Sequence, residues 1–304
     1  MQTTLLQMTV LMLCGALWGV FSPNGLNAMQ TRLVLTSAVY YFFLPAMILQ
    51  VLWHADIGWQ SLHYSLLACS SIAISIVLSW LLAKLLRCKP AQTGAIILAA
   101  SYPNVTYLGL PVLEQTFGVW ARSVVIQIDL FATAPMVYII GIMLARHFGE
   151  SEHEKPKHPL AFLNAPPFWA AFIAVLLNVW QVPAPVWFNG LLEKCSAAVA
   201  PMMIFSLGMA LTLRALHFRT LPYLLPIVLV KLFAQPYSAR YLAGFLDLES
   251  LQKAAAVLDI AMPSMIVGIV LCDRYRLDSG LYASAVTVTT ALSLISLPFW
   301  RQML

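Results

Sequence analysis

Long apolar runs, separated by short polar turns, occupy almost the whole sequence. Each run has about 20 residues, the length that a helix needs to cross a bilayer. Charged residues make up 10% of the chain, against about 25% in a soluble domain, so a soluble core cannot account for the composition. A β-barrel is excluded because it needs short segments of alternating polarity. The pattern predicts an all-α integral membrane protein with ten transmembrane helices, near residues 4–21, 33–53, 62–86, 91–113, 123–145, 161–182, 186–211, 221–245, 254–272 and 280–299.

The loops predict how the chain lies in the cell membrane. Lys and Arg concentrate in cytoplasmic loops. Here the loops after odd-numbered runs hold 11 of these residues, while the even-numbered loops and the termini hold 5. We therefore expect both termini outside, with a cytoplasmic linker at 149–160 between five helices in 1–148 and five in 161–304. The first run follows no Lys or Arg and precedes no cleavage site, so we interpret it as a retained helix.

Two of the apolar runs are interrupted at matching places. Residues 101–111 read Ser-Tyr-Pro-Asn-Val-Thr-Tyr-Leu-Gly-Leu-Pro, and residues 261–268 read Ala-Met-Pro-Ser-Met-Ile-Val-Gly. Proline opens a helix because it lacks an N–H and clashes with the preceding turn. Open backbone at membrane depth is tolerated only where protein or a watery cavity satisfies it. Matched interruptions in two halves point to a transporter's substrate site, and the candidate binding residues are Asn104, Thr106, Gly109, Pro111, Pro263, Ser264 and Gly268.

The two halves are predicted to be inverted repeats. Five spans reverse the orientation of whatever follows, so two similar halves must be related by an axis in the membrane plane. The second and seventh runs share a further pattern around Pro45 and Pro201, in residues 43–49 and 199–205. We expect Pro45, Pro103 and Pro201 to be helix breaks with a scaffolding role.

These motifs resemble the auxin efflux carrier family, which includes plant auxin exporters and bacterial permeases for dicarboxylates such as malonate or malate. The residues that carry the resemblance are Pro103-Asn104 with Leu108-Gly109-Leu110-Pro111, Pro201 with Ser206-Leu207-Gly208, Lys231-Leu232 with Pro236, and Met262-Pro263 with Tyr275. The resemblance implies the ten-helix fold of bile-acid/sodium symporters, in which broken helices 4 and 9 cross and one bundle moves against the other. The chain departs from plant carriers at Gly268, where they have a second proline, and it lacks their long cytosolic loop.

The interrupted helices suit a small carboxylate. A helix N-terminus carries about half a positive charge and free N–H groups, while the C-terminal ends offer carbonyls to a cation. Asn104 adds an amide that donates and accepts, and Thr106 and Ser264 add hydroxyls. The alternative for Asn104 is a structural clip that hydrogen-bonds the freed backbone, and both roles are compatible.

Three ionisable residues fall inside predicted spans: Asp129, Lys231 and Asp259. Such a residue costs about 2.5–3.5 kcal/mol at mid-helix on insertion scales, so it usually faces a cavity or a partner. Asp259 precedes Pro263 by one helical turn. It is our first candidate for a proton-coupling site, with Asp129 as the second. The alternative is a structural Asp–Lys pair, or a Lys231 that attracts an anionic substrate.

The predicted function is secondary active transport of a small organic anion, carboxylate, dicarboxylate or auxin-like, by an elevator type of alternating access. The alternatives are a sodium-coupled symporter of the bile-acid type, an intramembrane enzyme or a sensor. The sequence has no nucleotide-binding, zinc-protease or serine-hydrolase motif, and its five cysteines show no paired spacing. We therefore expect no catalytic residue, no metal and no cofactor beyond a coupling H⁺ or Na⁺. The expected partners are the anion and the lipid bilayer; a homodimer is left open, and no nucleic acid is expected.

Overall fold

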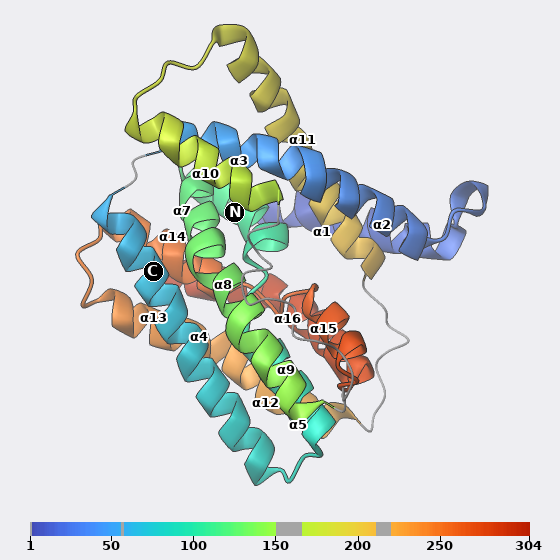
Figure 1. Ribbon diagram of the computed structural model, residues 1–304. Helices are drawn as coiled ribbons and strands as arrows, with labels where there is room; N and C mark the ends of the chain where they lie inside the picture. The colour runs from blue at the N-terminus through green and yellow to red at the C-terminus, as the bar shows by residue number, and fades with distance from the viewer. Residues whose placement is uncertain (1, 56–57, 150–165, 211–219) are drawn as a thin grey trace.

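A computed structural model of the protein describes residues 2–55, 58–149, 166–210 and 220–304 (Figure 1). Most of the predicted linker at 149–160 therefore lies outside the described residues. Within the described ranges the chain is helical, without a named strand. Five helices in these ranges are long and apolar enough to cross a membrane: Ala28–Trp53, Trp59–Leu85, Ala121–Phe148, Val186–Met209 and Ser279–Met303. This part of the chain is thus an all-α membrane protein, as the apolar runs predict.

One set of helices, the panel group, lies along the top of Figure 1. Its members pack against one another and come from both halves of the sequence: α1 (Gln2–Phe21), α2 (Ala28–Ala38), α3 (Leu44–Trp53), α10 (Pro166–Val179) and α11 (Val186–Ala210). Asn178 of α10 ties this group together, because its Nδ2 donates to the carbonyls of Leu52, Trp53 and Ala55 at 2.8–3.1 Å.

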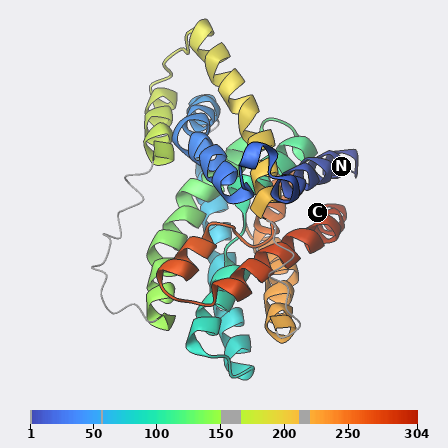
Figure 2. The same ribbon diagram turned by 90° about the vertical axis from the view of Figure 1, so that its right-hand side faces the viewer.

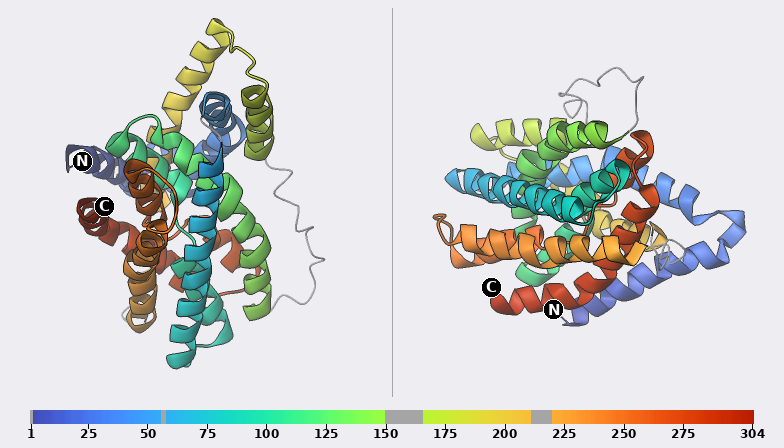
Figure 3. Two further views of the ribbon diagram at one scale, coloured as in Figure 1. Left: turned by 90° about the vertical axis from the view of Figure 1, so that its left-hand side faces the viewer. Right: turned by 90° about the horizontal axis from the view of Figure 1, so that it is seen from below.

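The remaining helices form the crossing group. They are α4 (Trp59–Leu85), α5 (Pro90–Ser101), α6 (Leu110–Phe117), α7 (Ala121–Ile128), α8 (Ala134–Met136), α9 (Ile142–Phe148), α12 (Leu221–Leu229), α13 (Gln235–Ala243), α14 (Ser250–Ile260), α15 (Gly268–Arg274) and α16 (Ser279–Met303). Figures 2 and 3 show α1 and the end of α16 on the same side of the molecule. The panel group touches the crossing group where α1 meets α6 and α3 meets α7.

Four prolines of the apolar helices follow a short π-helical segment. In each case the segment ends two residues before the proline, and the residue between them donates its N–H to the carbonyl five residues back. The wider turn accommodates a residue that cannot donate to the carbonyl four residues back. The segments and their prolines are η2 (Val39–Phe43) with Pro45, η3 (Val105–Gly109) with Pro111, η4 (Asp129–Thr133) with Pro135, and η9 (Val230–Ala234) with Pro236; a further segment is η5 (Val137–Gly141).

Helices α1 and α11 pack so closely that only glycine fits at two positions of their contact. A methyl group on Gly15 would overlap the carbonyl oxygen of Phe205, and one on Gly208 would overlap that of Met12. Small residues allow this close approach between membrane helices, where van der Waals packing drives association. The contact pairs the first helix of the chain with a helix of its second half.

Replacing Gly208 by alanine is therefore expected to lower the free energy of unfolding by about 1–3 kcal/mol through overpacking. Gly190 lies on the same helix with nothing within 4 Å of an added methyl group, so Gly190→Ala is the matched control. Thermal unfolding of the purified variants in detergent measures the difference. Equal melting temperatures for the two variants would contradict the close α1–α11 contact.

Candidate functional site

The two predicted interruptions are true helix breaks. Helix α5 ends at Ser101 and α14 ends at Ile260, each just before the proline that was expected to open it. The helices resume only after the breaks, through η3 and α6 in the first half and through α15 in the second.

Main-chain hydrogen bonds join the two breaks to each other. The N–H of Asn104 donates to the carbonyl of Pro263 at 2.8 Å, and the N–H of Met265 donates to the carbonyl of Tyr102 at 3.0 Å. Together they form a short antiparallel bridge. The opened backbone of each helix is thus partly satisfied by the other.

Two tyrosines hold the segments around the bridge. Tyr282 donates its O–H to the carbonyl of Met265 at 2.6 Å, and Tyr102 donates to the carbonyl of Met136 at 3.1 Å. A methyl group on Gly268 would overlap the Tyr282 hydroxyl. Glycine at 268, where the resembling plant carriers have proline, therefore leaves room for this tyrosine.

The place where the two broken helices meet at the bridge is called the crossing below. Several buried polar atoms there have no hydrogen-bond partner among the described residues. They include Ser101 Oγ, Asn104 Nδ2 and Ser264 Oγ, on side chains that are at most 1% exposed. The main-chain N–H of Ser264 donates to Thr289 Oγ1 at 3.2 Å, and the side-chain hydroxyl of Ser264 has no partner among the described residues. Leaving a buried polar group unpaired costs about 1–3 kcal/mol. The crossing therefore presents groups that a polar ligand would satisfy.

The backbone of Asn104, rather than its side-chain nitrogen, performs the clipping. Its carbonyl accepts from the N–H groups of Leu108 at 3.3 Å and Gly109 at 3.0 Å, while its own N–H pairs with Pro263. The side-chain Nδ2 has no partner within the described residues. The main chain of Asn104 thus makes structural contacts at the break, and the binding role of its side chain stays a prediction.

Asp259 lies in the last turn of α14, fully buried, and neither carboxylate oxygen has a hydrogen-bond partner within the described ranges. It packs directly against η3, because a methyl group on Gly109 would overlap its Oδ1. Glycine at 109 is what permits this approach. The charged side chains that act on Asp259 are those of Asp129 and Lys231.

The structure also brings Thr106 and Asp129 together. Thr106 of η3 donates its hydroxyl to the Oδ2 of Asp129, the first residue of η4. Two predicted site residues from neighbouring helices are thus paired, and the Asp129 carboxylate differs from that of Asp259 in having a partner.

Lys231 is fully buried beside the ends of both broken helices. Its Nζ donates to the Oε1 of Gln235 and, at 3.4 Å, to the carbonyl of Ile260. Gln235 in turn donates its Nε2 to the carbonyl of Ser101 at 2.7 Å. Among the described residues, Arg122 and Glu114 form an ion pair, whereas Lys231 Nζ and the carboxylate oxygens of Asp259 do not come within 4.0 Å of each other.

The other predicted prolines belong to different groups of helices. Pro111 is buried in the first turn of α6, directly after η3. Pro45 lies in the first turn of α3, within the continuous span Ala28–Trp53, and Pro201 lies inside the continuous helix α11, so the helix breaks expected at these two prolines are not found. The two helices pack against each other, and α11 also contacts η3, the segment that follows the bridge. The matched prolines of the second and seventh runs thus shape the panel group.

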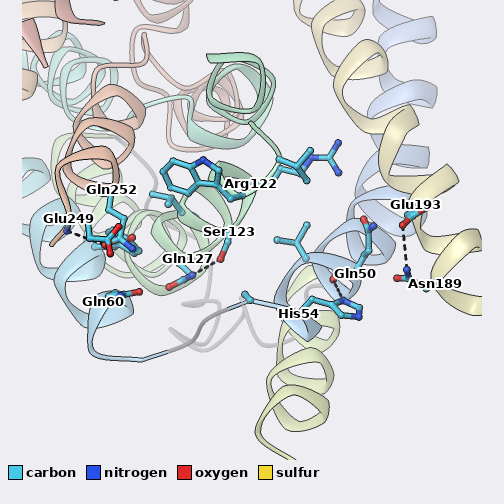
Figure 4. A pocket seen from close by; sticks show the side chains of 16 residues that line it. Gln50, His54, Gln60, Arg122, Ser123, Gln127, Asn189, Glu193, Glu249 and Gln252 are labelled. Atoms are coloured by element: carbon cyan, nitrogen blue, oxygen red, sulfur yellow. Dashed lines mark hydrogen bonds between the residues drawn. The ribbon is translucent and has the colours of Figure 1, made fainter. Parts of the chain in front are cut away.

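A separate polar cavity of about 530 Å³ lies between the two groups of helices. Figure 4 shows Gln50 of α3, His54 just after α3, and Asn189 and Glu193 of α11 on one side, facing residues of α4, α7 and α14. None of the predicted site residues lines this cavity. Its labelled residues on the crossing-group side are Gln60, Arg122, Ser123, Gln127, Glu249 and Gln252.

Helices α7 and α14 connect this cavity to the crossing. Gln252 lines the cavity and Asp259 lies seven residues further along α14, which is about 10 Å at 1.5 Å per residue. Arg122 of α7 donates to Ser196 of α11 at 2.9 Å and also pairs with Glu114. The guanidinium of Arg122 thus bridges the two groups at the cavity wall.

The described residues contain no cluster of His, Cys, Asp or Glu that could hold a metal ion. The cysteines at 14, 69, 88, 195 and 272 are all free.

The sequence did not predict the contacts that Gln235, Tyr282 and Thr289 make around the crossing. Gln235 could have been found, because it is a polar residue one helical turn after Lys231 in an otherwise apolar run.

Comparisons with known proteins identify transporters as relatives of this chain. The family described as "Membrane transport protein" matches residues 1–301. An uncharacterized transporter of Methanothermobacter thermautotrophicus is 28% identical over 305 residues, which cover 99% of this chain and 97% of the relative. The uncharacterized transporter MJ1031 of Methanocaldococcus jannaschii is 27% identical over 74% of this chain and 73% of its own length. The uncharacterized transporter YfdV of Escherichia coli K12 is 24% identical over 69% and 68%.

This family and these relatives are transporters rather than enzymes. The match extends over nearly the full sequence, including both helix breaks and the residues on which the resemblance to auxin efflux carriers rests. The chain therefore belongs to the membrane transport protein family, a family of the auxin efflux carrier type.

Proposed function

We propose that this protein is a secondary active transporter that binds a small organic anion at the crossing of the two broken helices. The observation that carries the proposal is the set of buried, unpartnered polar atoms on Ser101, Asn104 and Ser264, gathered where two backbones open at membrane depth. Open backbone at membrane depth is tolerated only where it is buried in protein or lines a water-filled cavity.

The chemistry of these atoms favours a carboxylate as the ligand. The amide Nδ2 of Asn104 can only donate, and the hydroxyls of Ser101 and Ser264 can donate as well. Helix segments also restart just beyond the breaks, and their N-terminal ends carry partial positive charge. A small carboxylate accepts from several donors at once, which matches this set.

The proposed architecture is a pair of inverted five-helix repeats that together cross the membrane ten times. Three features support it. The described helices coincide with the ten apolar runs, the breaks of the two halves meet each other, and α11 of the second half packs on α1 of the first.

The proposed mechanism is alternating access in which the crossing group moves against the panel group. The polar cavity between the two groups would then serve as one access route to the crossing. Movement of this kind has to break the contact between Arg122 and Ser196, which joins the groups at the cavity wall.

The experiment is a two-step test on the purified full-length protein. A panel of mono- and dicarboxylates is first screened for ligands that raise the melting temperature, because a ligand that binds the folded state stabilises it by mass action. Each such ligand is then tested for flux into liposomes that contain only this protein. Stabilising ligands that never cross the liposome membrane would overturn the transport proposal in favour of a sensor.

Both termini and the loops after even-numbered spans are proposed to lie outside the cell membrane, because of the Lys and Arg bias. A cysteine introduced at Asp247 is expected to react with an impermeant thiol reagent in whole cells, whereas one at Leu86 is not. Both residues are exposed, and the parent for both is the variant without its five native cysteines. Labelling at Leu86 without labelling at Asp247 would reverse the orientation.

A further inference from the structure

The C-terminal ends of the two broken helices face the same side chains. The last carbonyls of a helix have no partner within it, and they carry a partial negative charge. In transporters built on broken helices, such carbonyls coordinate the coupling cation. Helix α5 ends at Ser101 and α14 ends at Ile260, so these two carbonyls mark the corresponding position in this protein.

Side-chain nitrogen atoms already occupy that position. Lys231 Nζ donates to the Ile260 carbonyl at 3.4 Å, and Gln235 Nε2 donates to the Ser101 carbonyl at 2.7 Å. The Oε1 of Gln235 is turned toward Lys231 Nζ and accepts from it. Lys231 and Gln235 are both fully buried, so this arrangement is enclosed by protein.

A metal cation would need the same oxygen atoms. Hard cations are held by carbonyl, amide and carboxylate oxygens, and here the Ser101, Ile260 and Gln235 oxygens all accept from nitrogen donors. The nearby carboxylate of Asp259 is in electrostatic reach of Lys231 without touching it. The lysine is thus close both to a helix end, with its partial negative charge, and to a buried acid.

We propose that the Nζ group of Lys231 takes the place of a metal cation at the helix crossing, so that transport runs independently of Na⁺. This inference rests on the proposed transport function, and it excludes the sodium-coupled alternative that the bile-acid symporter fold suggests. The cation that such a symporter takes from solution is here replaced by a side chain of the protein.

The first test measures cation binding without any substrate. The melting temperature of the purified full-length protein is compared in NaCl and in choline chloride at equal ionic strength, and no difference is expected. Lys231→Ala is expected to gain a saturable, Na⁺-specific rise in melting temperature, because the oxygens of Gln235 and Ile260 lose their nitrogen donor and the Asp259 carboxylate loses its neighbouring lysine. Lys194→Ala is the control, since Lys194 is exposed on α11, and Lys231→Ser replaces the alanine variant if that variant does not fold.

The second test measures flux of radiolabelled malonate, and of any acid that stabilises the protein, into proteoliposomes. Uptake rates in NaCl and choline chloride are expected to agree within about twofold, a difference worth under 1 kcal/mol. A Na⁺-specific stabilisation of the parent protein, a tenfold loss of flux without Na⁺, or folded Lys231 variants that gain no Na⁺ response would each overturn the inference. If no acid is transported in either medium, the transport proposal fails, while the melting temperatures still decide whether Lys231 replaces a cation.

Discussion

Asp259→Asn is expected to abolish most of the proton movement that accompanies substrate transport, while leaving the protein folded. Asp259 is fully buried and neither carboxylate oxygen has a partner in the described part of the chain. Charge on a buried, unpaired carboxylate is costly, and a proton removes that charge. Asparagine has nearly the same shape, so the substitution removes the exchangeable proton and little else.

The measurement is substrate-driven proton movement in proteoliposomes, expressed as the ratio of protons to substrate. Asp247→Asn is the matched control, because Asp247 is exposed in the loop before α14. An unchanged ratio in Asp259→Asn would remove this residue from coupling. Asp129→Asn is then the decisive variant, since the Asp129 carboxylate is the second candidate and accepts from Thr106.

Removing the Asn104 or Ser264 side-chain group is expected to weaken anion binding strongly. Each side chain carries a buried atom that has no partner within the described residues and lies at the helix bridge. Losing one such hydrogen bond to a charged ligand costs about 1–3 kcal/mol, which is roughly a 5- to 150-fold rise in the dissociation constant. The variants Asn104→Ala and Ser264→Ala should keep the melting temperature of the parent, because main-chain atoms form the bridge.

Asn178→Ala is the control, because it is expected to change stability and leave anion affinity unchanged, the reverse of Asn104→Ala and Ser264→Ala. The Nδ2 of Asn178 caps three carbonyls of the panel group, so this variant should lose stability and keep its affinity for the anion. Ligand-dependent shifts of the melting temperature report both quantities in one titration. Unchanged affinity in well-folded Asn104→Ala would exclude that side chain from the binding site.

The sequence predicted the helix breaks because proline acts on its own helix. Pro103 and Pro263 cannot donate to the preceding turn whatever surrounds them, so the ends of α5 and α14 followed from local chemistry. The all-helical class followed equally from the apolar runs. Asn104 and Ser264 were selected for the same reason, since each directly follows one of these prolines.

The contacts between elements could not be predicted in the same way. The hypothesis of a direct Asp–Lys ion pair considered charge alone, whereas the position of Lys231 Nζ depends on how η9 packs beside α5 and α14. The π-helical turns before Pro45 and Pro236 could not be predicted from the sequence either. Proline removes a hydrogen-bond donor from any helix, but whether the chain breaks, widens or continues there depends on its neighbours, and the continuous helix α11 around Pro201 is the third case.

The bridge between the two breaks has a consequence for substitutions at the crossing. Its hydrogen bonds use only main-chain atoms, those of Tyr102, Asn104, Pro263 and Met265. A change of the side chain at Asn104 or Ser264 therefore leaves both bonds available. The join between the two helices and the polar groups beside it are thus encoded in different atoms, so point mutations can change the second without removing the first.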